Sequence, residues 1–269
     1  MADVVSVKYN GRVAVVTIDR PKKLNALTKD GFFELSKCLR EIDKVDEVVI
    51  TIIVGKGRFF SAGADVSTDR NTPAGLDPWR HALKDTTSSI FNITQAFYTH
   101  SKILVTALNG PVVGLTSALV SFSDFIYCMP HTYLLAPFTS LGLVAEGGSS
   151  LGFIRRMGVA KANEALIASR KIPADELLSC GYVNEIFDCA VGQEGPFLDM
   201  VLQRVEDLLG PHLVASSMLK TKALMLQPMR DQIDKQIVAE LFTGLDRSAR
   251  GIPQVEFAKI KSGAKRHKL

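Results

Sequence analysis

The sequence lacks the markers of several common protein classes. Its four cysteines form no CxxC pair and its five histidines are scattered, so we expect free thiols and no metal site. No apolar run comes near the roughly 18 residues that a membrane-spanning helix needs. The first residues lack the charged start and long apolar centre of a signal peptide. These absences predict a globular protein whose thiols are free, in a reducing or neutral compartment.

A large excess of charge of one sign is also absent from the sequence. The 269 residues carry 32 Lys and Arg against 28 Asp and Glu, a net charge of +4, and 46% are hydrophobic. This balance is ordinary for a globular protein and too mild to predict nucleic-acid binding, although it suits a small polyanion such as a nucleotide phosphate. The length fits one domain of moderate size, or a core with an appendage.

Strand and helix patterns begin at once. β-branched runs at 5–9 and 13–18 flank an Asn-Gly pair, which predicts a hairpin. A helical pattern follows, with Thr28 or Asp30 as its N-cap. The almost wholly apolar run 48–54 predicts a central strand that is buried on both faces.

Apolar strands then alternate with helices from about residue 45 to residue 190, which predicts an α/β fold. We expect a mobile polar loop over 67–83 before a helix that begins near Ser88. From residue 196 only helical patterns remain, and their wide apolar faces predict packing onto the main domain or a neighbouring subunit. The remaining strands are expected at 103–108, 124–128 and 133–135.

One acid stands out in the apolar stretch 134–148. Glu146 has no cation beside it in the sequence and directly precedes Gly147 and Gly148. A carboxylate among apolar groups has a raised pKa and can act as a general base near neutral pH, and paired glycines allow a tight turn. Alternatively, Glu146 caps a surface turn or the helix that starts near Ser149.

Two glycine-containing turns, 61–65 and 109–115, each follow a predicted strand. Backbone N–H groups at such strand-to-helix turns are unsatisfied donors, and one from each turn can meet at a single oxygen to form an oxyanion hole. Neither turn matches a GxxxxGK phosphate loop or a GxGxxG dinucleotide motif. Glycine turns of this kind are common in α/β folds, so neither is specific alone.

Taken together, four stretches resemble the crotonase family, the enoyl-CoA hydratase/isomerase superfamily. They are RPKKLNAL (20–27), FFSAGAD (59–65), NGPVVGLTSAL (109–119) and LGLVAEGG (141–148). The resemblance covers nearly the whole chain and is strongest to peroxisomal 3,2-enoyl-CoA isomerases of the fungal type. It implies an α/β fold with a crotonase-like ββα spiral over 1–195, which holds CoA and the active site. It also implies a helical region over 196–269 for assembly into homotrimers or homohexamers.

The resemblance also implies an acyl-CoA thioester substrate and no separate cofactor. Its thioester oxygen would bind the N–H groups of Ala64 and Leu115, and Glu146 would be the catalytic acid–base group. Hydratases of the family use two glutamates to activate water, and Ala118 and Phe138 stand at those positions here. One base suffices for a proton shift, so the resemblance implies conversion of 3-enoyl-CoA to 2-trans-enoyl-CoA. The residues assigned to substrate and CoA binding are Lys22, Lys23, Leu24, Ala62, Gly63, Asp65 and Phe138.

Three other polar residues have simpler interpretations. Asp65 is expected to cap the following turn, and His131 to be only a turn residue. Asn92 is a candidate hydrogen-bond partner of Glu146, but a position on a solvated helix face is the favoured interpretation.

The sequence ends in His267, Lys268 and Leu269, a variant of the Ser-Lys-Leu peroxisomal address. We therefore expect an import receptor as a partner and the peroxisomal matrix as the location. One alternative function is a dienoyl-CoA isomerase of the same fold, which would need a further acid from Asp65 or the 69–86 loop. Another is a non-catalytic acyl-CoA-binding subunit, against which an intact Glu146 argues.

Overall fold

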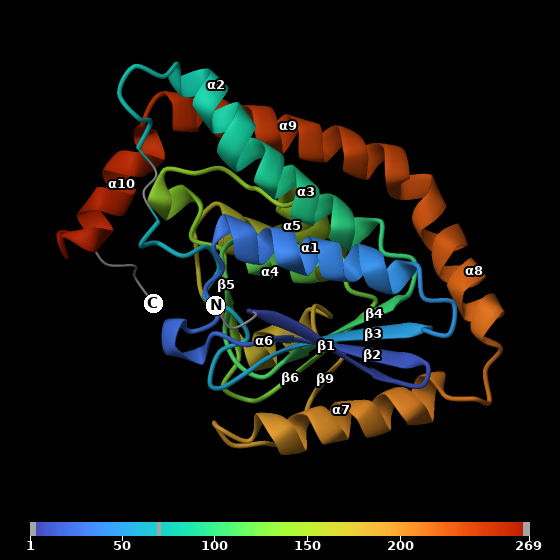
Figure 1. Cartoon of the computed structure of the whole chain (residues 1–269). Helices are drawn as coiled ribbons and strands as arrows, with labels where there is room; N and C mark the ends of the chain where they lie inside the picture. Colours follow the sequence, from blue (N-terminus) through green and yellow to red (C-terminus); the bar gives the residue numbers. More distant parts are fainter. Residues whose placement is uncertain (1–3, 69–70, 266–269) are drawn as a thin grey trace.

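A computed structural model describes residues 4–68 and 71–265. Its centre is a six-stranded sheet in the order β1-β2-β3-β4-β6-β9, in which β1 runs antiparallel to β2 and the other pairs are parallel (Figure 1). A second sheet has the order β5-β7-β8. The strands of the first sheet are β1 Val5–Asn10, β2 Val13–Ile18, β3 Ile50–Gly55, β4 Ile103–Leu108, β6 Phe125–Cys128 and β9 Glu185–Ile186. Those of the second are β5 Val112–Val113, β7 Tyr133–Leu135 and β8 Ile172–Pro173.

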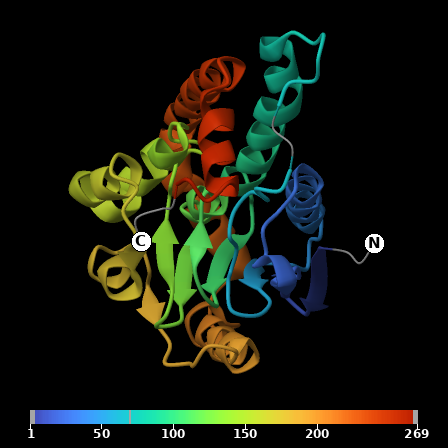
Figure 2. The same cartoon turned by 90° about the vertical axis from the view of Figure 1, so that its left-hand side faces the viewer.

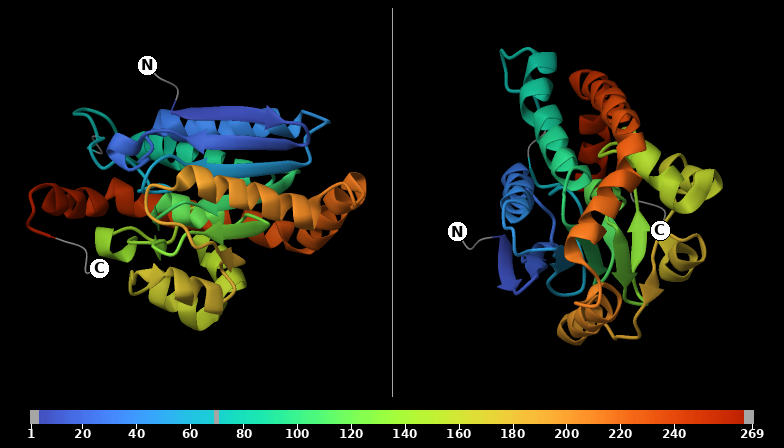
Figure 3. Two further views of the ribbon diagram at one scale, coloured as in Figure 1. Left: turned by 90° about the horizontal axis from the view of Figure 1, so that it is seen from below. Right: turned by 90° about the vertical axis from the view of Figure 1, so that its right-hand side faces the viewer.

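Helices cover both faces of the larger sheet, which explains why its central strands are apolar throughout. Every residue of β3 and of β4 is buried, as the continuous apolar runs predict. Helices α1 (Lys29–Asp43) and α3 (Ser88–Tyr98) lie over one face, and α7 (Glu194–Leu209) lies across the other (Figures 1 and 3). The α/β prediction is therefore confirmed.

Local signals place several elements as predicted. The hairpin of β1 and β2 forms around Gly11, whose φ is +55°. Thr28 is the N-cap of α1, since its side chain accepts a 3.2 Å hydrogen bond from the Gly31 N–H. This settles the choice between Thr28 and Asp30.

The expected loop over 67–83 is wrong at its C-terminal end. Helix α2 (Pro78–Ala82) continues through a π-helical turn, Leu83–Thr87, directly into α3. Asp77 caps α2 by accepting a 2.7 Å hydrogen bond from the Arg80 N–H, and Pro78 occupies its first turn. An Asp-Pro pair is a helix-start signal, but the polar composition of the stretch hid it.

The C-terminal third is helical in its described part. After α7 come α8 (Ala215–Leu226), α9 (Arg230–Ala249) and α10 (Ile252–Lys261). Helix α9 lies beside α2 and α3, and Ile233 and Ile237 pack against Tyr98 (Figures 1 and 2). The predicted packing of this region onto the main domain is thus confirmed for α9. None of the described helices is both long and apolar enough to cross a membrane.

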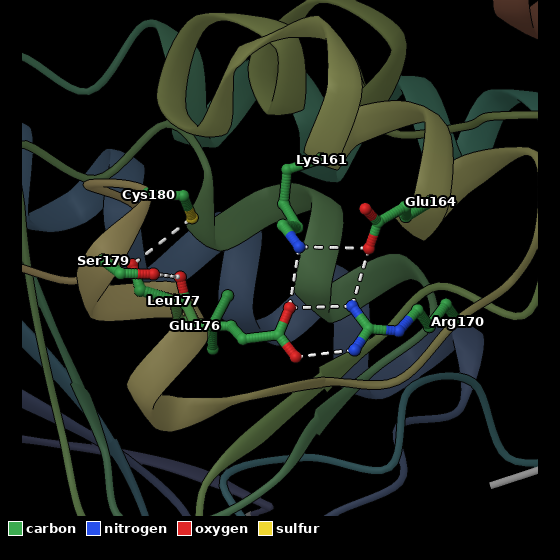
Figure 4. A network of polar contacts seen from close by, with 7 residues as sticks. All are labelled: Lys161, Glu164, Arg170, Glu176, Leu177, Ser179 and Cys180. Atoms are coloured by element: carbon green, nitrogen blue, oxygen red, sulfur yellow. Dashed lines mark hydrogen bonds and ion pairs between the residues drawn. The ribbon is translucent and has the colours of Figure 1, made fainter.

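An ion-pair network joins α5 (Ser149–Leu166) to α6 (Ala174–Ser179) (Figure 4). Arg170 bridges Glu164 and Glu176 at 2.6 Å each, and Lys161 pairs with Glu176 at 2.7 Å. These bonds lower the pKa of Glu176 to about 2. The network links the end of α5 to α6, with β8 of the second sheet between them.

Helix α4 (Leu115–Val120) follows β5.

Candidate active site

A cavity of about 390 Å³ lies between the start of α1, the 81–90 segment, the start of α4 and the C-terminal helices. Six of the residues that the sequence singled out line it: Ala62, Ala64, Asp65, Leu115, Phe138 and Glu146. Most of its remaining wall is aliphatic or aromatic. Segments far apart in the sequence therefore meet at one mainly apolar site.

The first candidate donor is the N–H of Ala64. Leu27 and Ala64 form a parallel bridge in which the Leu27 N–H donates to the Gly63 carbonyl and the Asp65 N–H donates to the Leu27 carbonyl. Since alternate residues of an extended segment point their N–H groups to opposite sides, the Ala64 N–H is directed away from this bridge. It donates no hydrogen bond within residues 4–68 and 71–265.

The second candidate donor is the N–H of Leu115, the first residue of α4. Gly114 precedes it with φ +63° and ψ −136°, a conformation that favours glycine. The first N–H groups of a helix have no partner inside the helix, and none is found for Leu115 in the part of the chain described. Both donor residues line the same cavity.

The two donor turns are in direct contact. Ser61 and Val112 form a β-bridge, and the Val113 N–H donates to the Ser61 carbonyl at 2.9 Å. A Cβ on Gly63 would lie only 2.6 Å from the Val113 carbonyl oxygen. Glycine is therefore required at this position for the two turns to approach so closely.

The segment that carries Glu146 packs against the second donor residue through the glycine pair that follows Glu146. Gly147 and Gly148 have φ values of +67° and +77°. A Cβ on Gly147 would be 2.7 Å from the Leu115 side chain, and one on Gly148 would be 2.4 Å from the Phe122 ring. The tight turn that the sequence predicted for this glycine pair is thus confirmed.

Asp65, the other predicted acid, is held by neighbours. Its Oδ1 accepts bonds from the Ser67 N–H at 2.9 Å and the Ser67 hydroxyl at 2.6 Å, and its Oδ2 pairs with Arg20 at 2.7 Å. The Ser67 hydrogen bonds, followed by Arg20, lower the pKa of Asp65 to about 2. The carboxylate caps the turn, as the sequence predicted, and at neutral pH it is too weak a base for proton transfer.

Apolar residues occupy the two positions at which the hydratases carry their glutamates. Ala118 is fully buried, and its Cβ lies 3.0 Å from where a Gly147 Cβ would be. Phe138 is also buried and lines the cavity. No carboxylate occupies either position, so the acids that the cavity wall does carry stand elsewhere.

Other sequence candidates lie apart from the cavity wall. Lys22 and Lys23 are exposed in a short 3-10 turn, and neither they nor Leu24 and Gly63 line the cavity. The Asn92 interpretations are both wrong, because its side chain accepts from Arg40 at 2.8 Å and donates to Ser36 at 2.7 Å, between α1 and α3. His131 lies in a turn, as expected.

The structure adds ionisable residues to the cavity wall: Lys29, His81 and Glu240, which the sequence did not single out, and Asp85, an acid of the 69–86 loop. Lys29 and Asp85 form an ion pair. Glu240 is buried in α9, where it follows Ile233 and Ile237 at helical spacing. A single acid on an apolar stripe was the signal that could have identified it. No group of three or more His, Cys, Asp or Glu in the described ranges is arranged to hold a metal ion.

Two amide donors and a carboxylate in an apolar cavity define a site for carbonyl chemistry in which negative charge develops on oxygen. Residues 8–246 match the model of the enoyl-CoA hydratase/isomerase family, and the chain belongs to that family. Among solved structures, an enoyl-CoA hydratase/isomerase from Pseudoalteromonas atlantica superposes with a TM-score of 0.83 at 24% identity, over 99% of this chain and 100% of that one.

Two fungal relatives align over almost their whole length. A Delta(3,5)-Delta(2,4)-dienoyl-CoA isomerase of Pyricularia oryzae is 52% identical over 100% of both chains. A 3,2-trans-enoyl-CoA isomerase of Saccharomyces cerevisiae is 29% identical over 98% of this chain and 96% of its own. The resemblance to the crotonase family and to its fungal isomerases is confirmed.

Proposed function

We propose that this protein is an isomerase that moves a carbon–carbon double bond in an acyl-CoA thioester. The observation that carries the proposal is the placement of Glu146, Ala64 and Leu115 on one mainly apolar cavity, while Ala118 and Phe138 occupy the positions of the hydration acids. The fungal relatives named above are isomerases of this kind, which supports the same class of reaction here.

In the proposed mechanism, Glu146 removes a proton from C2 of a 3-enoyl-CoA. The electron pair of that C–H bond moves into a dienolate, and the negative charge on the thioester oxygen is held by the N–H groups of Ala64 and Leu115. Removing one such donor typically costs about 3–4 kcal/mol of transition-state stabilisation. Glu146 then returns the proton to C4, which leaves a 2-trans-enoyl-CoA and the ionised carboxylate.

A 3,5-dienoyl-CoA is a second candidate substrate. The relative that is 52% identical over the whole chain is a dienoyl-CoA isomerase, and Asp85, from the 69–86 segment, supplies a further acid on the cavity wall. Both reactions begin with proton removal from C2. They differ in whether the proton returns to C4 or to C6, so the same Glu146 and donor pair serve either one.

Product analysis on three substrates tests the proposal. The purified protein is incubated with a 3-trans-enoyl-CoA, a 3,5-dienoyl-CoA and a 2-trans-enoyl-CoA, and products are identified by NMR and mass spectrometry. We expect double-bond transposition of the first substrate, and transposition of the second if the proton reaches C6. A 3-hydroxyacyl-CoA as the main product, or tight binding with no turnover of any substrate, would overturn the proposal in favour of a hydratase or a non-catalytic binding subunit.

The proposal also covers the cofactor requirement, the binding of the CoA phosphates and the cellular location. We propose that the reaction needs no cofactor beyond the CoA of the substrate, and that Lys22 and Lys23 assist its phosphates. We also propose import into the peroxisomal matrix through a receptor that binds His267, Lys268 and Leu269, which lie outside the described residues. A mouse relative, 25% identical, is named as a peroxisomal enoyl-CoA delta isomerase, which supports this location. Loss of import when the tripeptide is deleted from a fluorescent fusion would test it.

A further inference from the structure

Helix α9 holds the segment that carries Glu146 at both ends. Arg247 Nε donates to the Gly142 carbonyl at 2.5 Å. Glu240 accepts hydrogen bonds from the Gly148 N–H at 2.7 Å and from the Ser150 N–H at 2.9 Å. The 142–148 segment is therefore attached to a helix far away in the sequence.

We propose that Glu240 is a positioning residue that fixes Glu146 for proton transfer by binding the N-terminus of α5. The inference rests on the proposed role of Glu146 as the base. Glu240 acts through the backbone: the Glu146 carbonyl accepts from the Ser149 N–H at 3.2 Å, so Glu146 belongs to the turn that Glu240 binds.

A carboxylate suits this position because all of its partners are donors. Besides the two N–H groups, the Ser150 hydroxyl donates to Glu240 Oε1 at 2.5 Å, and Gln236 in turn donates to that hydroxyl at 2.8 Å. The first N–H groups of a helix are unsatisfied and carry partial positive charge, which an anion stabilises. The pKa of Glu240 is raised, because the effect of burial exceeds the lowering effect of these hydrogen bonds.

An amide cannot replace the carboxylate without conflict. A glutamine has the same shape, but one of its two terminal atoms is an NH2 group, a donor. Whichever way it is oriented, that group faces either the Gly148 N–H or the Ser150 donors. The turn must then shift, and a displacement of about 1 Å at a catalytic group can cost roughly 10²-fold in rate.

The test compares Glu240→Gln with Asp234→Asn. Asp234 is also an acid of α9, and it accepts a 2.6 Å bond from the Tyr98 hydroxyl without contacting the 142–150 segment. For Glu240→Gln we expect kcat to fall by about 10- to 100-fold. KM should change by less than about threefold. Asp234→Asn should leave both kcat and KM unchanged.

A kcat and KM of Glu240→Gln no different from those of Asp234→Asn would overturn the inference. If Glu240→Gln does not fold, Ser150→Ala removes one of the three bonds, and the absence of a kcat-selective loss in that variant would overturn it equally. Glu146→Ala in the same assay separates the two claims. Full activity of Glu146→Ala refutes the proposed function, whereas an inactive Glu146→Ala beside an unaffected Glu240→Gln refutes only the positioning role.

Discussion

Asp65 and Glu146 are both carboxylates on the cavity wall. Asp65 accepts three charge-assisted hydrogen bonds, from Ser67 and Arg20, which hold its pKa at about 2. Glu146 follows an apolar run and precedes two glycines that press its turn against α4. At the scale of single residues, the bonds to Asp65 thus identify it as a structural acid, while the proposed role of Glu146 rests on its place on the cavity wall.

The lowered pKa of Asp65 predicts a pH-dependent contribution to stability. Its folded pKa lies below the unfolded value of about 3.9, so the ionised form stabilises the fold above about pH 4, and this stabilisation is lost as the pH falls towards 2. We expect Asp65→Asn to lower the free energy of unfolding by about 1–3 kcal/mol at pH 7. The difference from wild type should shrink as the pH falls below about 4.

Urea unfolding at pH 7 and at a series of acidic pH values measures this difference. Asp188→Asn is the control, since Asp188 is exposed. An equal loss of stability for Asp65→Asn at every pH would contradict the assignment.

At the scale of elements, the buried strands and the start of α1 could be predicted because their signals are local. Strands β3 and β4 are continuous apolar runs, and Thr28 precedes α1 as a typical cap. The start of α2 at Pro78 was missed because its sequence is polar. The place of Glu240 at the site was missed for a different reason. An apolar stripe shows that a helix face is buried, but it does not show which element covers that face.

The turn between Glu146 and α5 yields a prediction at this scale. Gly148→Ala places a methyl group 2.4 Å from the Phe122 ring at φ +77°. We expect a loss of about 2–4 kcal/mol in the free energy of unfolding, the sum of backbone strain and overpacking, together with a fall in kcat. Urea unfolding and steady-state kinetics measure both effects.

Gly192→Ala is the matched control for backbone strain alone. Gly192 has φ +88° and no atom within 4 Å of an added Cβ. It should cost only about 1–2 kcal/mol and leave kcat unchanged. Equal losses in the free energy of unfolding for the two variants would contradict the prediction that contact with the Phe122 ring adds to the cost of Gly148→Ala.

At the scale of the whole molecule, the C-terminal helices contribute both to the cavity wall and to an exposed apolar surface. Helix α9 forms part of the cavity wall and binds the 142–150 segment, so the proposed catalytic site depends on both halves of the chain. The same region also exposes large apolar side chains on α8 and α9: Leu224, Met225, Val238 and Phe242. Exposed apolar side chains gathered on one region are typical of subunit interfaces.

We therefore expect assembly into a homotrimer or homohexamer through this region. Light scattering after size-exclusion chromatography should give three or six times the 29.3 kDa chain mass. The double variant Leu224→Glu, Met225→Glu should give a smaller species, since buried like charges oppose association. A wild-type mass of one chain at micromolar concentration would contradict the prediction.

The central claim is that Glu146 alone transfers the proton. The most direct measurement is kcat for transposition of the preferred enoyl-CoA by Glu146→Gln, with acyl-CoA affinity measured by calorimetry on the same sample. We predict a loss of about 10²–10⁴-fold in kcat with affinity changed by little, because the amide preserves the shape of the side chain but cannot accept the proton. Wild-type turnover by Glu146→Gln would contradict the account.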